Sequence, residues 1–131
     1  MGDVIMTTPA LHAIKETFNC RITLLTSNAG SLITPYISSI DETIVFDLPW
    51  VKNNSSIEPV ECLQFIEKLR TYQFDGAIIF TVYSQNPLPT VLLAHLADIP
   101  LRLAYCRENP YQLLTDWIPD KEPYSYIQHQ V

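Results

Sequence analysis

Helix-like and strand-like segments alternate along this chain, and their order constrains the fold more than any single motif does. Four short runs have the apolar character of buried parallel strands, at 21–26, 42–46, 76–81 and 101–105. Segments with helical spacing or helix-start signals precede and separate these runs, at 8–18, 31–37, from 58 onward and at 88–97. Such an alternation predicts an α/β domain with a doubly wound parallel sheet.

The first helix has two possible starting points. Thr8-Pro9 is a good cap and first-turn pair, and an apolar stripe follows it at helical spacing. The stripe consists of Leu11, Ile14 and Phe18. Val4 extends it by one period, so the helix alternatively begins near Asp3 and kinks at Pro9. A chain of this fold class normally begins with a strand, whereas this one begins on what resembles a strand-to-helix turn.

Later segments are less regular. The helix that begins near Glu58-Pro59 has one apolar face. Its members are Cys62, Phe65, Ile66 and Leu69. Beyond 105 the chain is rich in proline and aromatic residues, so we expect irregular structure as far as Pro123 and a helix at 126–131.

Composition favours one globular domain spanning 1–131. This length suffices for a core of its own, and 47% hydrophobic against 17% charged residues argues against disorder. Eight Lys and Arg against 14 Asp and Glu give a net charge of −6 without a basic cluster, which makes nucleic acid an unsuitable partner. Ten prolines against three glycines leave no glycine-rich phosphate loop.

Targeting signals and cysteine chemistry favour the cytoplasm. No apolar run approaches the roughly 18 residues of a transmembrane helix, and the first residues lack the basic region of an export signal. The three cysteines are far apart and lack metal-binding spacing, so we interpret them as reduced thiols.

Polar residues that follow the expected strands are the best candidates for chemistry. Gly2-Asp3 lies where a first strand would lead into a helix, at the carboxyl edge where open α/β sheets bind ligands. Asp3 either caps the helix or acts as a general base on a hydroxyl, and spacing does not distinguish the two. Ser84-Gln85-Asn86 follows the 76–81 strand and either binds sugar hydroxyls or caps the next helix.

The beginning of the chain resembles the amino-terminal half of glycosyltransferase family 9, which includes the lipopolysaccharide heptosyltransferases. The resemblance rests first on Gly2-Asp3 followed by Thr7-Thr8-Pro9-Ala10-Leu11. The segments 74–79 and 88–104 resemble the family's fourth strand and its next helix and strand. Arg107-Glu108 resembles an Arg-Glu element that follows that strand.

This resemblance implies the Rossmann-like acceptor-binding domain of a GT-B enzyme. Such an enzyme transfers a sugar with inversion and without metal or other cofactor, from a nucleotide-sugar donor such as ADP-heptose to an anionic lipid-linked sugar acceptor. The residue matching Asp3 is the catalytic base that deprotonates the acceptor hydroxyl. The donor is held mainly by a second domain, and the acceptor implies peripheral contact with the inner face of the cell membrane.

Acceptor contacts are expected from Gly2, Thr7, Ser84, Gln85 and Arg107. A guanidinium forms two parallel hydrogen bonds to a carboxylate or phosphate, which favours Arg107 as the contact to an acidic acceptor. An ion pair of Arg107 with Glu108 or Asp116 is an equally good interpretation.

The histidines and tryptophans are weaker candidates. We expect His12 on the surface, His95 packed within an apolar helix, and His129 at the start of a helix that leads toward a second domain. Trp50 and Trp117 are most simply core or loop anchors.

Two departures from the family pattern affect these expectations. Neither an apolar first strand before Gly2 nor a donor domain after Val131 is in the sequence. The first strand of a doubly wound sheet is central, so its absence predicts two half-sheets with exposed edges. We therefore expect the chain alone to be inactive as a transferase. Half of a split enzyme and a non-catalytic flavodoxin-like or nucleotide-binding module are the alternatives.

Overall fold

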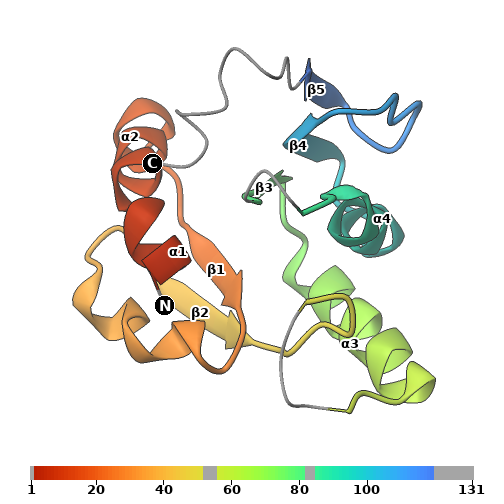
Figure 1. Ribbon diagram of the computed structural model, residues 1–131. Coiled ribbons are helices and arrows are strands. Elements are labelled where there is room, and N and C mark those ends of the chain that lie inside the picture. Colours follow the sequence, from red (N-terminus) through yellow and green to blue (C-terminus); the bar gives the residue numbers. More distant parts are fainter. Residues whose placement is uncertain (1, 52–55, 82–84, 120–131) are drawn as a thin grey trace. The chain divides into compact units, whose positions relative to one another are not determined.

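The computed structural model describes residues 2–51, 56–81 and 85–119 (Figure 1). The chain divides into two compact units, Met1–Ile57 and Glu58–Val131. Both units contain parallel strands and helices, in agreement with the predicted α/β class.

The first unit holds a two-stranded sheet. Its helices and strands are α1 (Gly2–Met6), α2 (Thr8–Phe18), β1 (Thr23–Thr26), the 3₁₀ turns η1 (Gly30–Leu32) and η2 (Thr34–Tyr36), and β2 (Glu42–Val45). Strands β1 and β2 are parallel, with Thr23 opposite Glu42 and Thr26 opposite Val45. The single short helix expected at 31–37 is wrong, because Pro35 has no N–H to donate and two 3₁₀ turns form instead.

The helix at the amino end begins near Asp3, which is the second of the two predicted starting points. It is interrupted at Thr7, two residues before the predicted kink at Pro9. Thr7 Oγ1 donates a hydrogen bond of 2.7 Å to the carbonyl of Val4, and Pro9 occupies the first turn of α2. The stripe on α2 is buried only at Leu11, and Phe18 in the last turn is 71% exposed. Burial therefore falls along the helix, and the expectation of a continuous apolar stripe is wrong at its end.

Gly30 marks a close approach between α1 and the sheet. A Cβ at this position would lie 2.2 Å from Thr26 Oγ1 and 3.2 Å from Val4 Cγ2. We expect Gly30→Ala to lower the free energy of unfolding by about 1–3 kcal/mol, because the Thr26 side chain must move to make room. Urea unfolding measures this, with Gly2→Ala as the matched control, since a Cβ there meets nothing within 4 Å. Equal unfolding curves for Gly30→Ala and the wild type would contradict the packing described.

Asp41 joins the end of α2 to the turn before β2. Its carboxylate accepts hydrogen bonds from Lys15 Nζ and from the backbone N–H of Ile22, the latter at 2.7 Å. These two bonds and the nearby positive charges of Lys15 and Arg21 hold the pKa of Asp41 below its usual range.

Acid is expected to remove the stabilisation that Asp41 provides. Because the pKa is lowered in the folded state, the contribution is complete at neutral pH and disappears as the pH falls below about 4. Between pH 7 and pH 3, the free energy of unfolding measured in urea should therefore fall less for Asp41→Asn than for the wild type. Asp75→Asn, at an exposed site in the second unit, is the control, and equal pH dependence of the Asp41 variant and the wild type would contradict the assignment.

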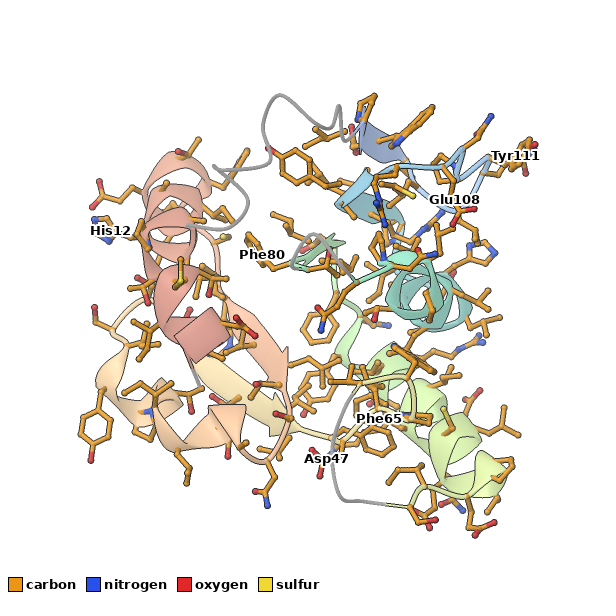
Figure 2. All side chains as sticks on the ribbon, viewed as in Figure 1. His12, Asp47, Phe65, Phe80, Glu108 and Tyr111 are labelled. Atoms are coloured by element: carbon orange, nitrogen blue, oxygen red, sulfur yellow. The ribbon has the colours of Figure 1, made fainter. Side chains whose placement is uncertain are left out.

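The second unit holds a three-stranded parallel sheet in the order β3-β4-β5. Its helices and strands are α3 (Pro59–Tyr72), β3 (Gly76–Ile79), α4 (Leu88–Leu96), β4 (Leu101–Cys106) and β5 (Asp116–Pro119). Helix α4 covers one face of the sheet, where Val91 packs with Ala104, Cys106 and Leu114 (Figure 1). Phe65 and Leu69 on the predicted apolar face of α3 are buried. Figure 2 labels Phe65 on this helix.

Strand β5 corrects the expectation of irregular structure after 105. Its sequence, Asp-Trp-Ile-Pro, has weak strand character, and pairing with β4 decides its conformation. The Trp117 ring N–H donates to the carbonyl of Cys106 at 2.9 Å, so the tryptophan is an anchor between the two strands, as expected. The helix expected at 126–131 lies outside the described residues.

The described strands thus form two half-sheets, as the sequence predicted. The carboxyl ends of β1 and β2 form one edge in the first unit, and those of β3, β4 and β5 form another in the second. Open α/β sheets generally bind ligands at edges of this kind.

Candidate functional site

In the first unit, the helix that carries Asp3 packs against the turn that follows β1. Asp3 is in the first turn of α1, and α1 packs against η1, which follows β1 after a short turn. The contact runs through Val4, whose side chain lies over Gly30. Across the same edge, the N–H of Asn28 donates to Asp47 Oδ1 at 2.9 Å and joins the loops that follow the two strands (Figure 2 labels Asp47).

The Asp3 side chain is exposed, and within the described part of the chain it takes part in no hydrogen bond or ion pair. A capping role would require its oxygen to accept a bond from a nearby backbone N–H. No capping hydrogen bond is made by this side chain within the described residues, but its place in the first turn of α1 favours the positive end of the helix. A role as general base stays a prediction.

Thr7 and Gly2 have different surroundings. The Thr7 hydroxyl is half-buried and is used in the bond to Val4 that ends α1, which is a structural task. Gly2 is exposed, with open space where a side chain would be. Acceptor binding by these two residues stays a prediction.

In the second unit, two polar loops meet at the carboxyl edge of β3 and β4. Asn86 Nδ2 donates to Glu108 Oε1 at 2.8 Å, and Asn86 Oδ1 accepts from the N–H of Leu88 at 2.9 Å. Asn86 thus binds the first N–H of α4, although the N-cap position itself is Pro87, and it also joins the loop after β3 to the loop after β4. Figure 2 labels Glu108 in this region.

Gln85 and Arg107 flank this pair in the sequence, and both are exposed. The loops that carry these two predicted acceptor contacts are thus brought together at one edge of one sheet. Ser84, the remaining predicted contact, lies outside the described residues. The Asn86–Glu108 bond was not predicted, although two polar residues that follow neighbouring parallel strands are a signal that could have suggested it.

His12 and His95 lie on helices and not in the loops of these edges. His12 points outward from α2, with Nε2 3.4 Å from Glu16 Oε1 (Figure 2). His95 is exposed, which corrects the expectation of a packed histidine, because it lies on the solvent side of α4. Trp50 is 39% exposed after β2 and is not a core residue. His129 lies outside the described residues.

Within the described ranges, no group of three or more His, Cys, Asp or Glu side chains is placed to hold a metal ion. The three cysteines are free, as predicted. No described helix has both the length and the apolar character that crossing a bilayer requires.

Comparison with known proteins identifies a structural relative. No protein-family profile and no curated protein sequence matches this chain. Among solved structures, the Escherichia coli ADP-heptose LPS heptosyltransferase II superimposes with a TM-score of 0.68 and 20% sequence identity. The match covers 89% of this chain and 31% of the heptosyltransferase chain, so the present chain spans less than a third of that protein. This similarity establishes the fold, and it agrees with the Rossmann-like α/β arrangement that the sequence predicted.

Proposed function

We propose that this chain is the acceptor-binding part of an inverting, metal-independent glycosyltransferase of the heptosyltransferase kind. The observation that supports this proposal most strongly is the structural similarity to E. coli ADP-heptose LPS heptosyltransferase II over 89% of the chain. Two segments carried the resemblance to glycosyltransferase family 9. Gly2-Asp3 begins α1, which packs against the turn after β1, and Arg107-Glu108 directly follows the carboxyl end of β4. Ligands of open α/β sheets bind at such edges.

Asp3 is the proposed general base. An inverting displacement requires one base to remove the proton from the attacking hydroxyl while that oxygen bonds to the anomeric carbon and the nucleoside diphosphate leaves. An exposed carboxylate in the first turn of α1 has room for a substrate hydroxyl beside it. The nucleotide-sugar donor is proposed to bind mainly to residues beyond this chain, and no cofactor or metal is needed.

Arg107 is the proposed contact to an anionic acceptor. The chain as a whole carries a net charge of −6, so an anionic sugar needs a local positive charge to bind. Arg107 directly follows β4, and its neighbour Glu108 is held by Asn86. A guanidinium in this position forms paired, charge-assisted hydrogen bonds to phosphate or carboxylate.

Replacing Arg107 by Ala is expected to weaken binding of a phosphorylated sugar roughly tenfold or more, the equivalent of one lost charge-assisted hydrogen bond. Titration of the chain with glucose 6-phosphate, followed by nuclear magnetic resonance, measures the affinity. Arg70→Ala is the matched control, because Arg70 is an exposed arginine in the same unit, on α3, 4.0 Å from Glu67. Equal affinities of the two variants would contradict a role for Arg107 in acceptor binding.

A further inference from the structure

Arg102 is a buried arginine on β4. Its side chain is on the same face of β4 as the buried residues Ala104 and Cys106, and α4 covers this face. Only 7% of the residue is exposed, and within the described ranges no carboxylate lies within ion-pair distance of it. Arginine is almost never this buried unless its charge is compensated, so the groups around the guanidinium must supply that compensation.

Three backbone carbonyls surround the guanidinium. Nε donates to Leu113 at 2.5 Å, one terminal nitrogen donates to Ile99 at 2.7 Å, and the other to Gln112 at 3.3 Å. Ile99 precedes β4, whereas Gln112 and Leu113 belong to 107–115, the helix-free connection from β4 to β5. The Arg102 side chain thus joins the end of the 107–115 connection to the residue that precedes β4.

The backbone of Arg102 reinforces the same tie. Its N–H donates to Thr115 Oγ1 at 2.7 Å, and its carbonyl accepts from the Thr115 N–H at 3.0 Å. Arg102 therefore contacts three residues at the end of the connection, two through its side chain and one through its backbone.

The start and the tip of the 107–115 connection are also fixed. The carbonyl of Glu108 accepts from the Cys106 thiol at 3.1 Å, in addition to the bond between the Glu108 carboxylate and Asn86. At the tip, Asn109 Oδ1 accepts from the N–H of Tyr111 at 2.8 Å, and Tyr111 has the strained φ of 51° (Figure 2). A non-glycine residue keeps such a conformation only where the surrounding bonds determine it.

We infer that Arg102 is a positioning residue: its guanidinium fixes the end of the 107–115 connection, the bonds of Glu108 fix its start, and the two together hold Arg107 where it meets an anionic sugar at the carboxyl edge of β4. This inference rests on the proposed function of Arg107. A planar guanidinium is required because its donors must reach carbonyls on both sides of it, and the single ammonium of a lysine does not span them. Arg102 touches no substrate and acts only through the connection.

The test compares Arg102→Lys and Arg102→Met with the wild-type chain, and uses Arg70→Met on α3 as the control. Amide hydrogen exchange reports local opening of 109–115, and titration with glucose 6-phosphate reports binding at Arg107. Both Arg102 variants are expected to raise exchange at 109–115 by about tenfold or more, with α3 amides unchanged, and to weaken sugar phosphate binding as Arg107→Ala does. The control is expected to change neither quantity.

Several results would overturn the inference. Unchanged exchange at 109–115 in both variants would show that other contacts fix the connection. Faster exchange with full affinity for glucose 6-phosphate would show that the connection does not position Arg107. If Arg102→Met does not fold, Arg102→Lys and Thr115→Val, which removes the hydroxyl acceptor, still decide the question. If Arg107→Ala binds like the wild type, the proposed function fails instead, and the exchange comparison alone decides whether Arg102 fixes the connection.

Discussion

Replacing Asp3 by Asn is expected to lower kcat by about 10²–10⁴-fold in an enzyme that joins this chain to a donor-binding domain. A suitable enzyme is a hybrid in which this chain replaces the segment of E. coli heptosyltransferase II that it matches. The amide of Asn has nearly the shape of the carboxylate but does not accept a proton from the acceptor hydroxyl. The loss should therefore appear in kcat, with little change in KM, when sugar transfer from ADP-heptose is measured.

The structure provides a clear control for this substitution. Because Asp3 has no capping hydrogen bond within the described residues, Asp3→Asn should lower the thermal unfolding temperature of the hybrid only slightly, through the loss of a negative charge at the amino end of α1. Glu16→Gln removes another exposed acid of the same unit and should keep full activity. A hybrid with Asp3→Asn that retains its kcat would sink the assignment of Asp3 as the base, and a change confined to KM would assign it to acceptor binding alone.

An added apolar strand is expected to stabilise the chain by about 3 kcal/mol or more, through the ladder hydrogen bonds and apolar burial that it gains. The four outer strands of the two half-sheets differ in their protection. Strands β2 and β5 carry Glu42, Asp116 and Pro119, which discourage edge pairing. Strands β1 and β3 contain no charged residue and no proline, and Ile78 on β3 is 41% exposed. The unprotected edges are therefore those of β1 and β3.

The experiment joins a lysine and five alternating valines and isoleucines ahead of Gly2. Urea unfolding should show a higher free energy of unfolding than for the chain as it is, and sedimentation should show less aggregation. The matched control carries serine and glycine in place of the apolar residues and should show neither gain. Equal stability of the two extended chains would contradict the view that β1 or β3 accepts a further strand.

Much of the fold could be predicted from the sequence because its signals are local. The helical spacing on α3 and the uncharged run of β3 are each contained in a short stretch of chain, so periodicity and composition reveal them. Strand β5 could not be predicted, because its short sequence has weak strand character and only pairing with β4 makes it a strand. The exposure of His95 likewise depends on which face of α4 meets the sheet.

The candidate site was predictable in part for the same reason. The position of Arg107 after a strand follows from the order of the segments, and Asp3 from the turn at the start of the chain. The bond between Asn86 and Glu108 joins residues 22 positions apart and depends on the neighbouring positions of β3 and β4. The carbonyl contacts of Arg102 also require the path of the 107–115 connection, which no periodicity encodes.

The most direct test of the central claim is the rate of sugar transfer by the unmutated hybrid, measured with ADP-heptose and an anionic lipid-linked sugar acceptor. If this chain is the acceptor-binding part of a heptosyltransferase-like enzyme, the hybrid transfers the sugar at a rate that depends on Asp3, whereas the isolated chain transfers none. A folded hybrid that binds both donor and acceptor but transfers no sugar would contradict the claim.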